Sequence, residues 1–250
     1  MDLGLRGKAC LVTGSTAGIG LATAQMLAVE GAHVVTCGRR VAPGIGEALH
    51  VTADLSEAEE PGRVVEQALG ALGRLDVLVN NIGLARQARF EEVEDAEWNA
   101  YWQLNVMSYV RSTRAALPHL RARGGSIVNV SSTAGKRPST GMPHYSVTKA
   151  AVLSLSRLVA DLYARDGIRC NAVTPGPTAT DAWLSEGGLA DQSGPDRTEV
   201  LARVGAGRPL GRLAEADEIA AVIVFLCSEQ ASYVTGAAWS ADGGTVPIIV

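Results

Sequence analysis

Short apolar runs alternate with longer helical stretches along nearly the whole chain, and this alternation leaves few folds open to it. We predict strands at 9–13, 33–37, 50–53, 77–80, 126–131, 169–174 and 237–241. We predict helices at 18–30, 62–72, 94–117, 144–165 and 216–226, two of which end near Pro118 and Gly167. This pattern is typical of a parallel sheet with helices on both faces. No linker rich in Pro, Gly or Ser interrupts it, so we expect one α/β domain over 1–250, with a doubly wound seven-stranded sheet.

The composition excludes several classes of protein. A length of 250 residues, a hydrophobic content of 47% and 28 glycines suit a compact chain rather than a disordered or fibrous one. The net charge of -4 argues against a basic nucleic-acid surface. The first eight residues lack the apolar core of a signal peptide, and the longest apolar stretch, 219–227, is too short to span a bilayer. We therefore expect a cytoplasmic protein that binds neither nucleic acid nor membrane.

Neither the cysteines nor the histidines predict a metal site. Cys10, Cys37, Cys170 and Cys227 form no close Cys-x-x-Cys pair, and the four histidines are dispersed. The first three cysteines fall inside predicted strands, where cysteine serves as a small buried residue in a reducing compartment. We expect no catalytic metal.

The first predicted strand runs into a glycine-rich segment, and a helix follows at once. This segment contains Gly14, Ser15, Thr16, Gly18, Ile19 and Gly20. Glycines allow a tight turn and close backbone approach, while the helix N-terminus offers free N–H groups and a partial positive charge. The spacing is G-x-x-x-G-x-G rather than G-x-G-x-x-G, so the interpretation depends on this mechanism and not on an exact motif. We predict a pyrophosphate site of a dinucleotide; a glycine turn without a ligand is the alternative.

The end of the second predicted strand bears on which dinucleotide would bind. An acidic residue there would bond the ribose 2′-hydroxyl of NAD, but this chain has Gly38 followed by Arg39 and Arg40. An arginine favours a 2′-phosphate instead. The hypothesis is NADP(H) bound through Arg39, with NAD(H) possible; a solvated loop is the alternative role for both arginines.

Tyr145 and Lys149 place a phenol and an ammonium one helical turn apart, and Ser132 lies thirteen residues upstream of Tyr145. A free tyrosine has a pKa of about 10 and exchanges protons poorly at neutral pH. A neighbouring ammonium can stabilise the phenolate, so Lys149 is expected to lower the pKa of Tyr145. A Tyr-x-x-x-Lys sequence also arises by chance on solvated helix faces, so its context must decide between these interpretations.

With these residues in place, the chain resembles the classical short-chain dehydrogenase/reductases over nearly its whole length, with a general similarity to 3-oxoacyl-carrier-protein reductases. Thr13 to Gly20 resembles the family's cofactor loop, and Asp54-Leu55 resembles its adenine-contacting pair. The other matching segments are Asn80-Asn81-Ile82-Gly83, Leu104-Asn105-Val106, Val130-Ser131-Ser132 and Pro175-Gly176 with Thr178 and Thr180. The spacing to Tyr145 selects Ser132 over Ser131.

The resemblance implies a Rossmann-type fold and an NADP(H)-preferring ketoreductase. Ser132 would bond the substrate oxygen, Tyr145 would deliver or remove its proton, and Lys149 would also bind the nicotinamide ribose. Asn105 would hold a water that links Lys149 to solvent; its alternative role is to cap backbone groups inside a helix. Cofactor contacts would come from Asn81, Ile82, Gly83, Tyr145, Lys149, Pro175, Gly176, Thr178 and Thr180, besides the glycine segment, Arg39, Asp54 and Leu55.

The same resemblance divides the chain by role. Residues up to about 130 would hold the cofactor, those from about 131 to 250 would carry catalysis and substrate binding, and 177–212 would form a lid. Trp183 in that lid could line the site or be packed in a core. Family members usually assemble, so we expect a homotetramer or dimer, to which the apolar tail 246–250 could contribute.

Two segments depart from the family pattern. Pro43, Gly44 and Gly46 interrupt the helix that usually joins the second and third strands, which weakens the cofactor assignment near the adenine. Lys136-Arg137-Pro138 is a basic stretch that could meet an anionic substrate group, although a solvated loop is slightly favoured.

No residue in the sequence identifies the substrate. A 3-oxoacyl thioester or a small or cyclic ketone is possible, with Arg86 and Arg89 as further rim candidates for an anionic or carrier-linked one. One alternative is an NAD(H)-dependent alcohol or sugar dehydrogenase. Another is a nucleotide-binding regulator without catalysis, which the complete set of Asn105, Ser132, Tyr145 and Lys149 disfavours.

Overall fold

The computed structural model describes residues 2–41, 45 and 48–247, and its centre is a seven-stranded parallel sheet of order β3-β2-β1-β4-β5-β6-β7. The predicted doubly wound parallel sheet is confirmed, because the strand order reverses direction between β1 and β4. Each predicted strand is present to within two residues at its ends. The strands are β1 (Ala9–Thr13), β2 (His33–Gly38), β3 (Leu49–Thr52), β4 (Val77–Asn80), β5 (Gly125–Val130), β6 (Ile168–Pro175) and β7 (Ala238–Ala241).

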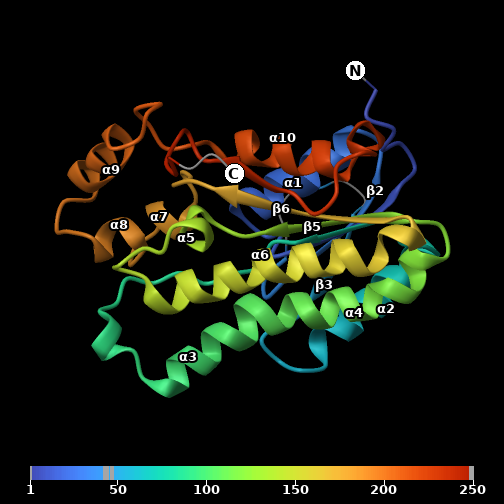
Figure 1. Cartoon of the computed structure of the whole chain (residues 1–250), viewed down its shortest axis with the longest axis horizontal. Coiled ribbons are helices and arrows are strands. Elements are labelled where there is room, and N and C mark those ends of the chain that lie inside the picture. The colour runs from blue at the N-terminus through green and yellow to red at the C-terminus, as the bar shows by residue number, and fades with distance from the viewer. Residues whose placement is uncertain (1, 42–44, 46–47, 248–250) are drawn as a thin grey trace.

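Helices cover both faces of the sheet (Figure 1). One face is covered by α1 (Gly18–Val29) and α10 (Ala216–Cys227). The other is covered by α2 (Glu60–Leu72), α4 (Ser108–Arg121) and α6 (Pro143–Tyr163). The remaining helical pieces are η1 (Phe90–Glu92), α3 (Asp95–Trp102), η2 (Gln103–Met107), α5 (Thr133–Lys136), η3 (Ala164–Asp166), α7 (Asp181–Leu184), α8 (Leu189–Gln192), α9 (Arg197–Ala206) and η4 (Glu229–Ala231).

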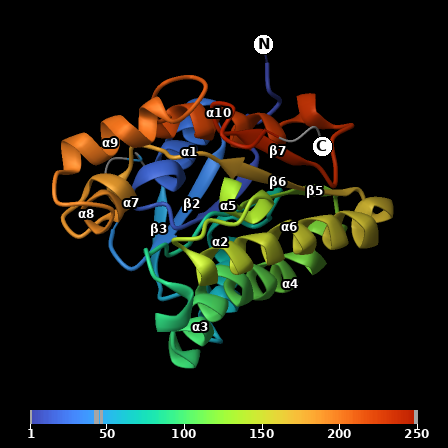
Figure 2. The same ribbon diagram turned by 60° about the vertical axis from the view of Figure 1, so that its left-hand side comes forward.

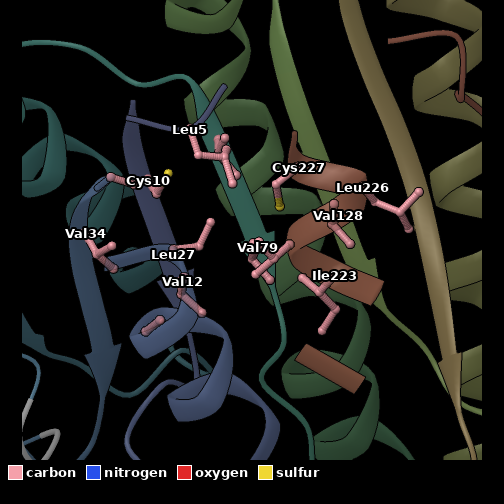
Figure 3. Close-up of a cluster of buried hydrophobic side chains, with 14 of the residues drawn as sticks. Leu5, Cys10, Val12, Leu27, Val34, Val79, Val128, Ile223, Leu226 and Cys227 are labelled. Carbon is pink, nitrogen blue, oxygen red and sulfur yellow. The ribbon is translucent and has the colours of Figure 1, made fainter. Parts of the chain in front are cut away.

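The strands are apolar on both faces because each face has its own core. In β1, Cys10 and Val12 pack toward α1 and α10, while Leu11 between them packs toward α2 and α4. This alternation follows from the two-residue period of a strand. Figure 3 shows the first core, where Leu27 and Ile223 of the two helices meet the side chains of β1 and β4. A strand buried on both sides is expected of a parallel sheet.

The helix predicted at 94–117 is interrupted and runs further than expected. η2, a π-helical turn that contains Asn105, separates α3 from α4, and π-turns of this kind are frequent at functional sites. Pro118 lies inside α4, so the prediction that it ends the helix was wrong. Its missing N–H would have bonded the carbonyl of Arg114, and both residues are exposed, so water can satisfy that carbonyl.

The segment after β6 leaves the sheet and returns to it. α7, α8 and α9 project beyond one end of the sheet (Figure 2), and a parallel bridge between Thr178 and Ala214 closes the base of the excursion. The prediction that Pro43, Gly44 and Gly46 interrupt a helix concerns positions outside the described residues. The last three residues of the predicted apolar tail, 248–250, are outside them as well.

Candidate active site

A cleft of about 670 Å³ opens at the carboxyl ends of the central strands. Its lining includes Gly83 after β4, Ser132 after β5 and Gly176 after β6, together with Tyr145 and Lys149 from α6. Parallel strands end at one edge of their sheet, and ligands of open α/β sheets bind at that edge. The fold therefore gathers three of the four predicted catalytic residues in one cleft.

Lys149 is nearly removed from water. It is 3% exposed, its Nζ donates to the carbonyl of Val130 at 2.9 Å, and the same atom lies 5.8 Å from the ring centre of Tyr145. Desolvation disfavours the ammonium and lowers the pKa of Lys149 to about 7. The group therefore titrates near neutral pH, which is uncommon for a lysine.

The pKa of Tyr145 is raised, contrary to the sequence prediction. Burial disfavours the phenolate, and the hydrogen bond of Ser132 opposes that effect only in part. The sequence predicted a lowered pKa from the ammonium of Lys149. Because Lys149 is itself buried and loses much of its charge near neutral pH, it cannot offset the desolvation of the phenol.

The two serines after β5 have different roles. The Oγ of Ser132 caps α5 by accepting from the N–H of Ala134 at 3.1 Å, which leaves its hydroxyl proton free to donate in the cleft. The Oγ of Ser131 donates to the carbonyl of Lys149 at 2.7 Å and so ties β5 to α6. Ser132 is thus the serine with a donor available to a ligand.

Asn105 lies behind the cleft rather than in it. Its amide is fully buried; Oδ1 accepts from the N–H of Leu84 at 2.9 Å, and Nδ2 donates to the carbonyl of Leu84 at 3.1 Å and to Thr148 at 3.1 Å. These bonds match the alternative role, in which the side chain satisfies backbone groups. A side chain at Gly83 would meet Lys149 Nζ at 3.2 Å and Asn105 Oδ1 at 3.6 Å, so glycine keeps the two groups close.

Tyr109 is a buried partner of Lys149 that the sequence analysis missed. Its hydroxyl oxygen lies 2.8 Å from the carbonyl of Ile82, 3.0 Å from that of Val130, and 3.4 Å from Lys149 Nζ, from which it accepts. It therefore links the segments that follow β4 and β5 beneath the cleft. Its position in the sequence could have revealed it, because Tyr109 follows Asn105 by four residues and a helix places two such residues on the same side.

The glycine segment has the features of a phosphate site. Gly14 and Gly18 have φ of 63° and 53°, values that other residues rarely adopt. No side chain caps the N-terminus of α1, so its first N–H groups can serve a ligand. Asn81 donates to the carbonyls of Thr13 and Gly14 at 3.2 and 2.9 Å and fixes the turn. These residues fit the pyrophosphate of a dinucleotide.

Ser15 is not available to a ligand through its donors. Its Oγ donates to the carbonyl of Val12 at 2.7 Å and accepts from the N–H of Cys37 at 2.9 Å, and its own N–H donates to the carbonyl of Cys37. Ser15 stays a predicted cofactor residue, and in this structure its side chain fastens the turn to β2. Thr16 packs beside Gly38, where a Cβ would lie 2.6 Å from its methyl group.

The predicted adenosine contacts lie at the carboxyl ends of β2 and β3. Arg39 is exposed and close enough to Asp54 to help lower its pKa, although hydrogen bonds from Ser56 are the larger cause. Leu55 is buried in the core beside α2, which leaves little of its side chain for an adenine. An exposed guanidinium at this edge remains available for a phosphate.

The segment after β6 links the two ends of the cleft. Thr178 donates to the carbonyl of Gly176 at 2.9 Å, and Gly176 donates its N–H to β7 at 3.0 Å. The side chain of Thr180 packs against Gly18 at the start of α1. Pro175, Gly176, Thr178 and Thr180 all line the cleft together with Ile19, Asn81 and Gly83.

The basic pair 136–137 is split. Lys136 turns away and donates to the carbonyl of Ala238 at 2.8 Å and to Ser240 at 3.0 Å, while Arg137 lines the cleft. Trp183 lines it too, so the packing alternative for that residue is not what the structure shows. Arg86 is instead bonded to Glu97 and Arg89 to Glu91, and neither arginine contributes to the lining.

The remaining candidates for reactive chemistry are buried thiols. Cys10, Cys37, Cys170 and Cys227 are free and buried, and burial raises the pKa of the last three to about 12. Within residues 2–41, 45 and 48–247, no three His, Cys, Asp or Glu side chains gather as metal ligands. The helices described in the same ranges include none with the length and hydropathy needed to cross a bilayer.

Comparison with known proteins places the chain in a family. Residues 14–246 match a family model described as enoyl-(acyl carrier protein) reductase. The oxidoreductase YvrD of Bacillus subtilis is 39% identical, covering 98% of this chain and 99% of that protein. The 3-oxoacyl-[acyl-carrier-protein] reductase FabG of Thermotoga maritima is 35% identical, covering 97% and 99%.

A solved structure gives the same result. L-sorbose reductase from Gluconobacter frateurii, in complex with NADPH and L-sorbose, is 37% identical and superposes with a TM-score of 0.93 over all of both chains. Fold, cleft and relatives agree: this chain belongs to the short-chain dehydrogenase/reductases, NAD(P)-dependent oxidoreductases that act on carbonyl and hydroxyl groups.

Proposed function

We propose that this protein interconverts a carbonyl and a secondary alcohol, with NADP(H) as the preferred cofactor and Tyr145 as the acid and base. The observation that carries the proposal is the convergence of Ser132, Tyr145 and Lys149 on one cleft beside the glycine segment. The bound nicotinamide would supply or accept the hydride. The side chains would supply position, a proton and a dipole for the substrate oxygen.

Each polar group has a distinct task in this proposal. Ser132, whose lone pair is occupied by Ala134, donates its proton to the substrate oxygen. Tyr145 transfers its proton to that oxygen: its raised pKa keeps the phenol protonated at neutral pH, and the oxygen becomes strongly basic as the carbonyl is reduced. Lys149, with a pKa near 7, can return a proton to Tyr145 and bind the nicotinamide ribose. Asn105, whose amide bonds Leu84 and Thr148, would hold the backbone beside Lys149 in place rather than bind a water.

The cofactor preference rests on Arg39. Its exposed guanidinium at the end of β2 suits a 2′-phosphate, and a sorbose reductase 37% identical to this chain was solved with NADPH. Arg39→Ala is expected to raise the KM for NADPH about tenfold and to leave that for NADH nearly unchanged. Arg165→Ala, in the exposed helical turn η3 and without an ion pair in the described chain, is the matched control. A wild-type preference for NADH would contradict the assignment.

The substrate proposal is broader. A 3-oxoacyl thioester or a small or cyclic ketone fits the cleft, and a relative of 35% identity is named for reduction of the first. An NAD(H)-dependent alcohol or sugar dehydrogenase is the alternative in the same family; the structural neighbour named for L-sorbose supports a sugar as substrate, although it was solved with NADPH. In either case 177–212, which contains α7 to α9, is proposed as the lid over the nicotinamide.

A substrate panel with wild type and Tyr145→Phe tests the proposal. Carbonyls are supplied with NADPH and alcohols with NADP⁺, and turnover is read from the absorbance of the reduced nicotinamide. We expect Tyr145→Phe to lower kcat/KM at least about 100-fold, the usual scale for loss of a proton donor. Its dissociation constant for NADPH should stay close to that of wild type. Near-normal turnover by the variant would rule out the mechanism, and binding without any turnover by wild type would favour a regulatory role.

A further inference from the structure

Within the described ranges, the cleft is lined by basic side chains and by no acidic ones. Among the described lining residues, three are cationic arginines, namely Arg137, Arg203 and Arg208, and none is a carboxylate; the amine of Lys149, with its pKa of about 7, adds only part of a charge. The whole chain carries a net charge of -4, so this positive surface is local and opposite in sign to the protein. A cleft lined by one sign of charge with low-dielectric walls concentrates ligands of the other sign.

The arginines of the cleft differ from those around it. On the same excursion from the sheet, Arg197 is bonded to Asp191 at 2.6 Å, and beside the cleft Arg86 is bonded to Glu97 at 2.6 Å. Arg203 lies 4.0 Å from Glu199 with both side chains exposed, which is a weak pair. In the described part of the chain, the guanidinium of Arg137 has no carboxylate partner.

These arginines come from two separate segments of the cleft lining. Arg137 follows α5, in the segment between Ser132 and Tyr145. Arg203 lies on α9 and Arg208 just after it, where its Nε donates to the carbonyl of Val204 at 3.1 Å. A group held in the cleft would also contact the apolar side chains that line it, including those of Leu84, Met142, Trp183 and Leu189.

We infer that the substrate carries, beside its reacting carbonyl, a negatively charged group that Arg137 and Arg203 bind from their separate segments of the cleft lining. The inference rests on the proposed function and names its substrate class: an acid or phosphate with an apolar body, rather than a neutral alcohol or sugar. The planar guanidinium forms bidentate bonds to carboxylates and phosphates alike. The nucleotide phosphates have their own proposed donors at the N-terminus of α1 and at Arg39, and Arg39 is not part of the cleft lining.

Two matched pairs of ketones test this inference with NADPH as cofactor. Levulinate and its methyl ester differ by a carboxylate. Acetoacetyl-coenzyme A and the acetoacetyl thioester of N-acetylcysteamine differ by the phosphates of the carrier. We expect kcat/KM of the charged member to exceed that of its neutral partner about tenfold in one of the two pairs. A difference in the first pair would identify the anion as a carboxylate, and a difference in the second would identify it as a phosphate. The preference should fall as salt is added, because exposed charges are screened.

Variants locate the effect. Arg137→Gln and Arg203→Gln should each lower the ratio of charged to neutral kcat/KM about tenfold, mainly through KM, while the dissociation constant of NADPH changes less than about twofold. Arg165→Gln serves as the control for a general loss of positive charge. A shift confined to the NADPH constant would assign these arginines to the cofactor and overturn the inference.

The result also separates this inference from the proposed function. If the neutral members are reduced as well as the charged ones, the oxidoreductase function stands and the anion site is refuted. If none of the four compounds is reduced while the wider substrate panel shows turnover of neutral ketones, the oxidoreductase function stands and the anion site is again refuted.

Discussion

At the scale of the residue, Lys149 connects catalysis to stability. A lysine that is charged in the unfolded chain and has a pKa of about 7 in the folded one binds fewer protons when folded, between about pH 7 and pH 10. The free energy of unfolding should therefore decrease as the pH falls through that range. Below about pH 7 both states hold the proton, and the loss should stop.

Lys149→Met removes this titration and keeps the volume. As the pH is lowered from 9.5 to 7, the free energy of unfolding of wild type should fall relative to that of the variant by about 3 kcal/mol, since each pKa unit is worth about 1.4 kcal/mol. Urea denaturation of both proteins at each pH would measure this difference. A difference between the two proteins that does not change with pH would show that Lys149 is not desolvated as described.

Tyr109 and Tyr101 form a matched pair for the energetics of a buried hydroxyl. Tyr109 is fully buried and its hydroxyl contacts two carbonyls, so Tyr109→Phe should lower the free energy of unfolding by about 1 to 2 kcal/mol. The hydroxyl of Tyr101 is buried without a partner in the described chain, so Tyr101→Phe should be neutral or stabilising. Equal losses in chemical denaturation would contradict this account.

At the scale of the element, two glycines in helices predict opposite outcomes. A Cβ on Gly20 in α1 would lie 2.3 Å from the carbonyl oxygen of Gly14, which is a backbone atom, so the turn must move. Gly70 in α2 is exposed, with nothing within 4 Å of a Cβ. Gly20→Ala should destabilise by about 2 kcal/mol or more and weaken NADPH binding, whereas Gly70→Ala should stabilise by about 0.5 to 1 kcal/mol. Calorimetry and cofactor titration would measure both, and normal NADPH binding by Gly20→Ala would exclude the phosphate site.

The strands and helices were predictable where the apolar residues repeat with a clear period. The strands alternate between two cores, as Cys10, Leu11 and Val12 do, and Gly or polar residues bound them, so their positions followed from the sequence. The break at Gln103–Met107 was not predictable, because a π-turn is set by the tertiary bonds of Asn105 rather than by local propensity. Pro118 was misleading because its effect depends on which face of the helix it occupies.

The sequence predicted which residues form the site better than where their side chains point. Ser132, Tyr145 and Lys149 were identified from their spacing, and the fold gathers them as expected. The directions of Ser15 and Lys136 depend on acceptors in β2 and β7, which the local sequence does not reveal. Arg203 and Arg208 were missed because only the return of 177–212 over the sheet brings them to the cleft.

At the scale of the whole molecule, one helix face lacks a partner among the residues that the structure describes. On α6, Leu158 and Leu162 are 54% and 59% exposed and lie one turn apart, on the side away from the sheet. Contiguous exposed apolar side chains often mark an interface. We predict that this face joins two copies in the expected dimer or tetramer.

Leu158→Glu with Leu162→Glu should reduce the assembly to a smaller species in sedimentation velocity, because a buried carboxylate pair would repel its copy. Val29→Glu, at an exposed position on α1, is the control and should leave the mass unchanged. A wild type that sediments as a monomer would refute the prediction.

Alkylation of the four buried cysteines would report whether a molecule has unfolded. They lie on β1, β2, β6 and α10, on both sides of the sheet, and a buried thiol of high pKa barely reacts with alkylating reagents. Alkylation must then wait until the sheet separates from its helices, so its rate follows the lifetime of the native state rather than the chemistry of the reagent. Counting modified cysteines by mass after storage would therefore show which molecules have unfolded even once, including those that have since refolded.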